Sequence, residues 1–148
     1  MIRRYGEPVK TGHRYKRRPG VYAVLIRDGR ILVTRQDAPT PEYQLPGGGI
    51  DAGEHPIAAL HREVREETGW KIDIRLRLGA FRRFTYMPEY GFCAEKICTV
   101  YLARPIYPLG PPTETGHTAH WMTLAQAAAK LGNAGDRAML LALPKRLR

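Results

Sequence analysis

The sequence contains little cysteine, few acidic residues and no long hydrophobic run. Its two cysteines, Cys93 and Cys98, lie five residues apart in one expected strand, so their side chains face opposite sides of it. We therefore expect no disulfide between them, and because their spacing is not that of a zinc site, we expect reduced thiols in a cytoplasmic protein. No segment approaches the ~18 apolar residues that a membrane-spanning helix needs. The basic N-terminus is not followed by the apolar stretch of a secretory signal.

Acidic residues number 14 against 24 lysines and arginines, which gives a formal charge of +10. The excess is concentrated in residues 1–18, where seven basic residues accompany Glu7 alone. A field of this sign attracts nucleotides, nucleic acid or anionic lipid, but it is equally compatible with a solvated terminus that keeps the protein soluble. We therefore separate a basic N-terminal arm (residues 1–18), either frayed or part of the same domain, from a folded domain at residues 19–148.

Length and composition fit one ordinary globular domain. A chain of 148 residues can bury enough surface to fold without a disulfide or a metal staple. Hydrophobic residues make up 43% and charged residues 26%, a balance that excludes a disordered chain or a fibrous repeat.

Turn and cap signals divide the chain into strands and helices. Asp28-Gly29 joins two β-rich runs and predicts a hairpin, whereas the Pro-Gly-Gly-Gly segment 46–49 predicts a break between elements. Pro56 and Gly69 bracket an amphipathic helix. We expect strands at 21–26, 31–34, 71–86 and 92–104, a short apolar piece at 43–45, and helices at 56–68, 124–131 and 136–143, the last beginning at Asp136. This order predicts an α/β fold with a mixed sheet covered by helices on its faces.

Three glutamates gather on one face of the expected helix 56–68. Glu63, Glu66 and Glu67 stand at positions i, i+3 and i+4, on a different side from the apolar stripe through Leu60 and Val64. Like charges at this spacing repel one another, and a divalent cation would neutralise them. Hard oxygen ligands indicate magnesium or manganese rather than zinc. For the glutamates alone, a solvated acidic face is the commoner alternative.

The residues before this helix change that balance. The glycine-rich turn lets the backbone approach a ligand closely, and a turn that leads into a helix N-terminus suits phosphate. Glu54 lies at the mouth of the helix, where the helix dipole favours an acid. One compact unit therefore places a phosphate-binding loop beside a metal-binding helix, which is the pairing that phosphoryl chemistry needs.

These residues resemble the Nudix box of the Nudix hydrolases. The positions that match by identity are Gly48, Glu54, Arg62, Glu63, Glu66, Glu67 and Gly69, with Val64 at an apolar position and Trp70 where a smaller aliphatic residue is usual. The strand ending at Arg35, the Leu45–Gly48 entry and Trp121 before a helix are also similar to Nudix domains. The resemblance implies an α/β/α sandwich and makes residues 19–148 a Nudix hydrolase domain.

The resemblance implies a role for each matching residue. Glu63, Glu66 and Glu67 correspond to glutamates that bind Mg²⁺, with Mn²⁺ as an alternative, together with the carbonyl of Gly47. In part of the family the residue at the position of Glu63 is instead the base for water. Arg62 corresponds to an arginine that orients the catalytic carboxylates. Metal ions would lower the pKa of a bound water, which attacks one phosphorus of a pyrophosphate linkage.

Many relatives supply a further metal-binding carboxylate from a loop outside the box. Glu114 is the candidate for it, with Glu89 and Glu95 as rivals. His117 and His120 flank the same loop, and we interpret them as surface residues rather than phosphate ligands.

Residues outside the box also select the substrate. Gly48 and Glu54 are candidates for substrate contact at the phosphate-binding turn, and Arg35 resembles an arginine near the base in triphosphate-cleaving relatives. Tyr86, 16 residues after the box, has a spacing found in hydrolases of dinucleoside polyphosphates. Pro88 lies slightly late for the proline associated with ADP-ribose enzymes. We favour a nucleoside triphosphate such as oxidised dGTP, with dinucleoside polyphosphates or ADP-ribose as alternatives.

Two other classes of protein stay open. A non-catalytic Nudix-fold module could hold RNA on the basic arm, although degenerate members of that kind usually lack box glutamates that this chain keeps. A Nudix-fold isomerase would need other catalytic side chains, for which Cys93 and Cys98 offer little support. A small nucleotide is the expected partner, no membrane partner is expected, and a homodimer is compatible with the family.

Overall fold

The computed structural model describes residues 2–148, which form a sheet with helices on both of its faces. The strands are β1 (Arg3–Gly6), β2 (Tyr15–Arg27), β3 (Arg30–Gln36), β4 (Glu42–Gln44), β5 (Gly47–Gly49), β6 (Trp70–Met87), β7 (Phe92–Pro108) and β8 (His117–Thr123). The helices are α1 (Pro56–Thr68), α2 (Leu124–Lys130) and α3 (Ala134–Leu141), followed by a 3₁₀ turn at Lys145–Leu147.

The sheet is mixed. Within residues 2–148 its eight strands follow the path β1-β6-β7-β2-β3-β4, with β5 paired to β2 and β8 paired to β3. β1 runs parallel to β6 and β2 parallel to β7, whereas β2–β3 and β6–β7 are antiparallel. The β2–β3 hairpin turns at Asp28 (φ 52°) and Gly29 (φ 74°), two positive φ angles that suit an Asp-Gly pair. The predicted α/β class is confirmed.

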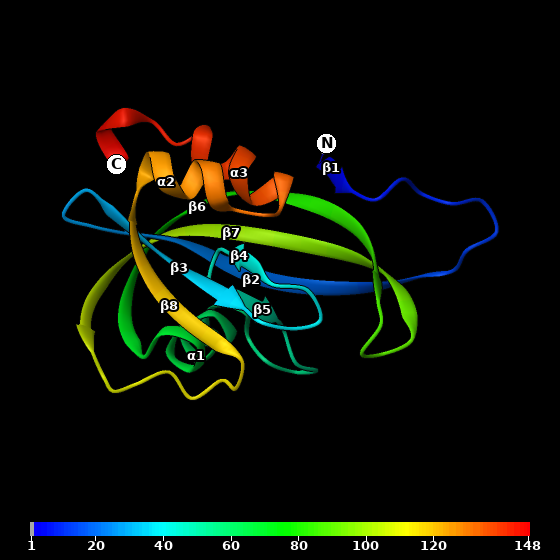
Figure 1. Cartoon of the computed structure of the whole chain (residues 1–148), viewed down its shortest axis with the longest axis horizontal. Coiled ribbons are helices and arrows are strands. Elements are labelled where there is room, and N and C mark those ends of the chain that lie inside the picture. The colour runs from blue at the N-terminus through cyan, green and yellow to red at the C-terminus, as the bar shows by residue number, and fades with distance from the viewer. Residues whose placement is uncertain (1) are drawn as a thin grey trace.

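The helices bury a separate core on each face of the sheet (Figure 1). α1 packs Leu60 and Val64 against one face, over β2 and β6. α2 and α3 pack Ala127 and Leu140 against the other face, over Phe81 of β6. All five side chains are buried. The α/β/α layering that the resemblance implied is therefore present.

α1 has the boundaries predicted from the sequence. The His55 side chain caps it by accepting the backbone N–H of Ile57 at 3.1 Å, and Pro56 occupies the first turn, where its missing N–H has no helical partner to lose. Gly69 ends the helix with φ 77°, and its N–H donates to the carbonyl of Arg65 at 2.8 Å. Both ends of α1 are fixed, so its acidic side chains have a defined position toward β5.

Two expectations about local structure were wrong. Residues 47–49 are not a break but the strand β5, because backbone without side chains can lie directly against β2; a Cβ at Gly47 would stand 2.2 Å from the carbonyl oxygen of Val21. The last helix begins at Ala134 rather than Asp136. Asn133 caps it by accepting the N–H of Gly135 at 2.8 Å, and Asp136 is buried inside it.

The N-terminal segment contributes two strands to the sheet. β1 pairs with β6, and Tyr5 packs edge-on against Phe81 with ring centroids 5.6 Å apart. β2 begins at Tyr15 and pairs with β7 along its whole N-terminal half. Of the two free thiols, Cys98 is buried and Cys93 is half-buried. No helix within residues 2–148 is long and apolar enough to cross a membrane.

Candidate active site

A polar cleft lies between β5, α1 and one face of the sheet. Arg18, Gly20 and Tyr22 line it from β2, since alternate residues of a strand point to the same face. Glu63 and Glu67 line it from α1. The fold thus brings the glutamates of the helix next to a basic and aromatic strand that is distant in the sequence.

Glu67 is buried, with 5% of its surface exposed. Its Oε1 accepts the backbone N–H of Gly47 at 3.0 Å, so β5 fixes the position of the carboxylate. Burial raises the pKa of Glu67 well above its ordinary value, and the charges of Glu63 and Glu114 raise it further. The carboxylate is therefore held in a place where a negative charge lacks compensation.

Glu63 reaches the cleft through the space that Gly48 leaves. A Cβ at Gly48 would lie 2.6 Å from the Glu63 carboxyl carbon and 2.7 Å from its Oε2, so any side chain at this position would displace the carboxylate. Burial also raises the pKa of Glu63, against the lowering effect of its hydrogen bond from Arg62.

Arg62 is the hub of an ion-pair network behind these carboxylates. Its Nε and Nη2 donate to the two carboxylate oxygens of Glu54 at 2.7 and 2.8 Å, a bidentate arrangement. Its Nη1 donates to Glu63 at 2.9 Å and to Glu66 at 3.3 Å. The Arg62 hydrogen bonds lower the pKa of Glu54 to about 2. Glu54 thus orients Arg62, and Arg62 orients the glutamates, while Glu54 itself does not line the cleft.

The loop before β8 closes over the same helix. The backbone N–H groups of Thr113 and Glu114 both donate to the carbonyl oxygen of Glu66 at 2.8 Å. Glu114 lies near enough to Glu63 and Glu67 for its charge to raise the pKa of both carboxyls. The structure therefore brings the predicted loop carboxylate to the box glutamates.

His117 was interpreted as a surface residue, but it lines the cleft. Its Nε2 lies 3.7 Å from Oε2 of Glu67, and its side chain is 17% exposed. Its buried Nδ1 has no hydrogen-bond partner within residues 2–148. His120 lies outside the cleft, where its Nε2 is 2.8 Å from the hydroxyl of Thr118.

The donor set beside α1 fits a hard divalent cation. Its oxygens come from Glu63, Glu66, Glu67 and Glu114, and the charges of the other three carboxylates add to the effect of burial in raising the pKa of Glu67. Within residues 2–148 no three such side chains already stand in metal-binding geometry, while Arg62 holds Glu63 and Glu66. A cation of the Mg²⁺ or Mn²⁺ type would supply the missing countercharge.

Two further predicted substrate contacts, Arg35 and Tyr86, also lie away from the cleft. Nη1 of Arg35, in β3, is 2.8 Å from Oδ1 of Asp37, and the Arg35 side chain does not line the cavity. Tyr86, near the end of β6, is 51% exposed, whereas Tyr90 in the following turn lines the cleft. Spacing along the chain identified an aromatic turn but not the ring that faces the cavity.

The sequence reasoning missed the polar floor of the cleft. This floor comprises Tyr22, Arg83, Lys96, Cys98, Asn133 and Asp136. The period of two in Arg18, Gly20 and Tyr22, and again in Lys96 and Cys98, was a usable signal. The spacing alone does not show that β2 pairs with β7, which sets Arg18 beside Lys96 and Gly20 beside Cys98.

Burial controls the protonation of this floor. It raises the pKa of Tyr22 and that of the Cys98 thiol, the latter to about 12, and lowers the pKa of Lys96. It also raises the pKa of Asp136 to about 7, although that carboxylate accepts the backbone N–H of Leu45 at 3.2 Å. The floor is therefore poor in stable negative charge, in contrast to the wall formed by α1.

An α/β/α sandwich whose helix presents clustered glutamates to a glycine-rich strand is the arrangement that the Nudix box implied. The NUDIX domain family matches residues 16–143. The chain belongs to the Nudix hydrolase family.

Individual relatives match in part. An RNA pyrophosphohydrolase of Cereibacter sphaeroides is 54% identical over 54 residues, which cover 35% of this chain and 33% of that protein. The CMP-5'-(N-acetyl-N-hydroxy-3-aminopropyl)phosphonate hydrolase of Streptomyces rubellomurinus is 32% identical over 134 residues, which cover 85% of this chain and 61% of that protein. The chain thus spans about a third of the length of the first relative and less than two thirds of the second.

Solved structures share the fold over most of the chain. A NUDIX hydrolase from Nitrosomonas europaea superposes with a TM-score of 0.71 at 20% identity, covering 85% of this chain and 87% of that one. A MutT NUDIX hydrolase from Burkholderia pseudomallei gives a TM-score of 0.67 at 27% identity, covering 87% of this chain and 99% of that one.

Proposed function

We propose that this protein is a Mg²⁺-dependent pyrophosphohydrolase that cleaves a phosphoanhydride of a nucleoside 5′-triphosphate, with oxidised dGTP among the candidate substrates. The observation that carries the proposal is the placement of Glu63 and Glu67 in one cavity with Arg18 and Lys96. Carboxylates that gather a divalent cation and cations that neutralise phosphate are both needed to hydrolyse an anhydride.

In this proposal Glu63, Glu66 and Glu67 hold the metal ion, with the Gly47 carbonyl and Glu114 as further ligands. The bound ion would shield phosphate charge and lower the pKa of a coordinated water. Glu67 is anchored by the Gly47 N–H at 3.0 Å. Arg62 orients Glu63, and Gly48 leaves the space in which the Glu63 carboxylate stands.

The remaining cleft residues suit a nucleoside. Gln44, Asn133 and Asp136 line the same cavity as the glutamates, and amide and carboxyl groups can pair with the polar edge of a base. Oδ1 of Asn133 accepts the N–H of Gly135, which leaves its NH₂ group as a donor. These polar groups support a nucleotide over an inorganic polyphosphate.

A nucleotide panel tests the proposal. The whole chain is incubated with and without Mg²⁺ with nucleoside triphosphates including oxidised dGTP, a dinucleoside polyphosphate, ADP-ribose and a 5′-triphosphate oligonucleotide. The last substrate is included because RNA pyrophosphohydrolases are among the relatives. Chromatography of the products identifies the bond that is cleaved. Hydrolysis of nucleoside triphosphates only when Mg²⁺ is present is the expected result.

Glu67→Gln provides the matching variant. The glutamine keeps the shape and the oxygen that accepts the Gly47 N–H, but it removes the buried charge, so we expect kcat to fall by at least about 100-fold. Glu7→Gln removes one exposed carboxylate outside the cleft and should leave kcat unchanged. Equal activity of Glu67→Gln and the wild type would contradict the assignment of this glutamate, and inactivity of the wild type toward every anhydride would overturn the proposed function.

A further inference from the structure

Four side chains form a strip of alternating cations and aromatic rings beside the cleft. Lys16 and Arg18 come from β2, and Tyr90 and Phe92 come from the β6–β7 turn and the start of β7. Lys16 Nζ stands 5.2 Å from the centroid of the Phe92 ring, and Arg18 Cζ stands 4.9 Å from that of Tyr90 and 5.9 Å from that of Phe92. We call these four residues the cation–aromatic strip.

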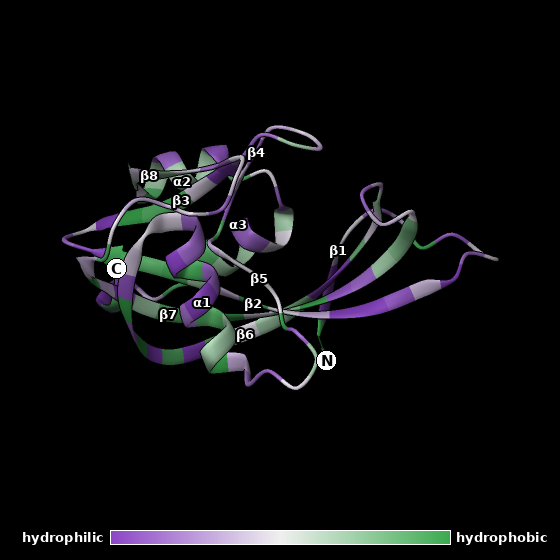
Figure 2. Ribbon diagram, turned by 90° about the horizontal axis from the view of Figure 1, so that it is seen from below, coloured by the Kyte–Doolittle hydropathy of each residue, from purple (hydrophilic) through white to green (hydrophobic). Residues whose placement is uncertain are grey.

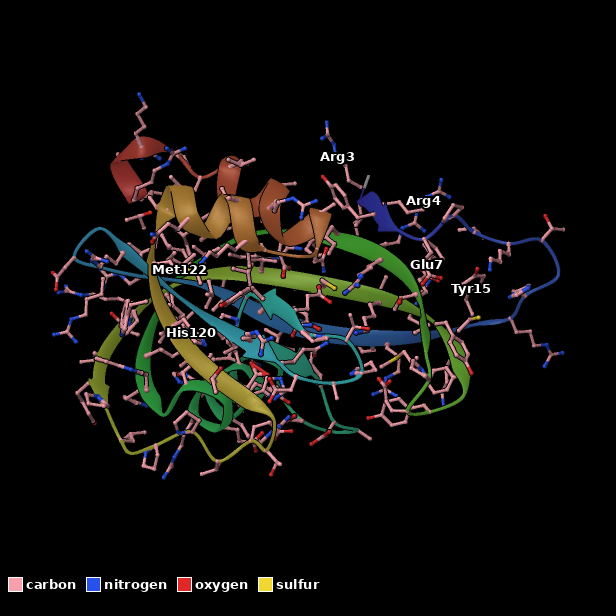
Figure 3. The ribbon with its side chains drawn as sticks, in the orientation of Figure 1. Arg3, Arg4, Glu7, Tyr15, His120 and Met122 are labelled. Carbon is pink, nitrogen blue, oxygen red and sulfur yellow. The ribbon has the colours of Figure 1, made fainter. Side chains whose placement is uncertain are left out.

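Within residues 2–148, no helix covers the part of the sheet on which the strip lies (Figure 2). Figure 2 shows the hydrophilic first half of β2 and the β6–β7 turn projecting beyond the layers formed by the helices. Figure 3 shows Glu7 and Tyr15 at this projecting end and His120 on β8, in the helix-covered part of the molecule. Tyr90 is 57% exposed and Lys16 is exposed, so a ligand could reach both.

The strip is continuous with the cleft. Arg18 and Tyr90 belong to it and also line the cavity that holds Glu63 and Glu67. Arg18 extends to β5, where its Nη2 would be 3.8 Å from a Cβ at Gly49. A chain that leaves the cleft over Arg18 and Tyr90 would therefore meet Phe92 and Lys16 next.

The charge of the strip is not neutralised. Within residues 2–148, neither Lys16 nor Arg18 forms an ion pair. Glu95, on the adjoining strand β7, pairs in the register with Arg17, so its side chain points to the face of the sheet opposite the strip. On that face it forms ion pairs with Arg17 at 3.8 Å and Arg82 at 3.7 Å. Glu89, which lines the cleft, is an acid near the strip.

We propose that the cation–aromatic strip binds the second and following nucleotides of a single-stranded nucleic acid whose 5′-polyphosphate end occupies the cleft. The inference rests on the proposed function and extends its substrate from a free nucleotide to the end of a chain. Exposed rings offer a surface on which unpaired bases stack, and the cations between them can neutralise the phosphates that join those bases. A duplex keeps its bases stacked inside and cannot use the rings.

The direct test measures binding of a single-stranded oligonucleotide with a 5′-hydroxyl, which isolates the strip from the hydrolytic site. Fluorescence anisotropy with the whole chain is recorded at several salt concentrations for the wild type, Lys16→Gln and Lys130→Gln. Lys130 is the matched control, because it is an exposed lysine at the end of α2, 5.7 Å from the ring centroid of Tyr43, and it belongs neither to the strip nor to the cleft lining. Lys16→Gln should lower the slope of log Kd against log salt by about 0.7, and Lys130→Gln should leave it unchanged.

A second variant tests the contribution of the aromatic rings of the strip to binding. Phe92→Leu keeps an apolar side chain in β7 but removes the flat ring, so we expect Kd to rise about tenfold with an unchanged salt slope. Thermal melts of each variant verify that the fold is kept. Equal affinity of the wild type and both strip variants would overturn the proposal. So would equal affinity for a duplex of the same length, or Lys16-dependent binding to phosphatidylserine vesicles without binding to the oligonucleotide.

Hydrolysis assays separate this proposal from the proposed function. Lys16 does not line the cleft, so Lys16→Gln should hydrolyse a free nucleoside triphosphate like the wild type and show a raised KM only for a 5′-triphosphate oligonucleotide. An unchanged KM for both substrates would overturn the strip while the proposed function stands. If the protein binds the oligonucleotide through the strip but cleaves no anhydride, the proposed role of the strip is supported and the proposed function is overturned.

Discussion

Glu67 and Asp136 are both acids buried in the same cleft, but they have different neighbours. Glu67 faces other carboxylates, and its unbalanced charge suits a cation. Asp136 lies on α3 near Arg83 and Lys96, whose charges lower its pKa but do not offset the effect of burial. The environment of each residue, rather than its type, thus separates the proposed cation ligand Glu67 from Asp136, a carboxyl that is half protonated near neutral pH.

The protonation of Asp136 makes stability depend on pH. Its pKa rises from 3.8 in the unfolded chain to about 7 in the folded protein, so the folded state holds a proton that the unfolded state releases between these values. The stabilisation of the folded state by this proton is fully present below pH 4 and is lost as the pH rises through 7. Its full size is on the order of 4 kcal/mol.

Asp136→Asn tests this dependence, because the amide keeps an oxygen for the Leu45 N–H but does not titrate. The unfolding free energy of the variant minus that of the wild type should rise by about 2.6 kcal/mol from pH 5 to pH 8, because only the wild type loses stability as Asp136 ionises. Urea unfolding at the two pH values measures the difference. The same difference in unfolding free energy at both pH values would show that Asp136 is ionised in the folded protein throughout.

At the scale of elements, hydrogen bonds join the C-terminal end of α1 to the loop that carries Glu114. The carbonyl of Gly69 accepts the N–H of Leu109 at 2.7 Å, and the carbonyl of Glu66 accepts those of Thr113 and Glu114. The turn at Gly69 is therefore packed from outside as well as constrained in its backbone.

Gly69→Ala should destabilise the protein for two reasons. The residue has φ 77°, which an alanine adopts at a cost of about 1 kcal/mol, and its Cβ would collide with the carbonyl oxygen of Gly110. Gly53→Ala is the matched control, because Gly53 has φ 76° but no atom within 4 Å of a Cβ. Thermal or urea unfolding should show a loss of about 1 kcal/mol at Gly53 and a clearly larger one at Gly69. Equal losses of unfolding free energy for the two variants would mean that the loop containing Gly110 moves away from the new Cβ at no cost in stability.

The elements most accessible to sequence reasoning were those with local signals. Pro56 and Gly69 mark the ends of α1, and Asp28-Gly29 marks the β2–β3 turn, because each of these residues acts through its own backbone. β5 was not predicted, since a run of glycines becomes a strand only when β2 lies beside it.

The candidate site divides in the same way. The glutamates that share one helix face could be predicted from their spacing along a single helix. The polar floor depends instead on the pairing of β2 with β7, which joins Arg18 to Lys96, some 80 residues later in the sequence. Tyr86 was predicted from its spacing after the box, whereas Tyr90 lines the cleft. The geometry of the turn between β6 and β7, which decides which ring faces the cleft, has no signature in that spacing.

At the scale of the whole molecule, a layered body carries the cleft with the clustered glutamates, and the hydrophilic first half of β2, which holds Lys16, Arg17 and Arg18, projects beyond the helices (Figure 2). The body and the projecting end are joined by strands that run through both, β2, β6 and β7. β1 closes the β6 edge of the sheet at this end and contacts α3. The N-terminal strand thereby links the projecting end to the core beneath α2 and α3.

This linkage predicts that β1 unfolds together with the body. Tyr5 packs edge-on against Phe81, which is 1% exposed and also touches α3 through Gly135. Tyr5→Ala should therefore lower the free energy of unfolding by about 2 kcal/mol. Tyr86→Ala, which truncates a half-exposed tyrosine on the same strand β6, should change it by less than about 0.5 kcal/mol.

The two tryptophans make the cooperativity measurable. Trp70 and Trp121 pack edge to face 5.6 Å apart in the body, away from β1, so their fluorescence reports on the body alone. If the sheet unfolds as one unit, Tyr5→Ala shifts the tryptophan transition in urea and the far-ultraviolet circular dichroism transition by the same amount. A tryptophan transition that stays at the wild-type midpoint while the dichroism signal separates into two steps would mean that β1 is an independent arm. The strip would then lie on a sheet whose β1 edge opens without disturbing the cleft.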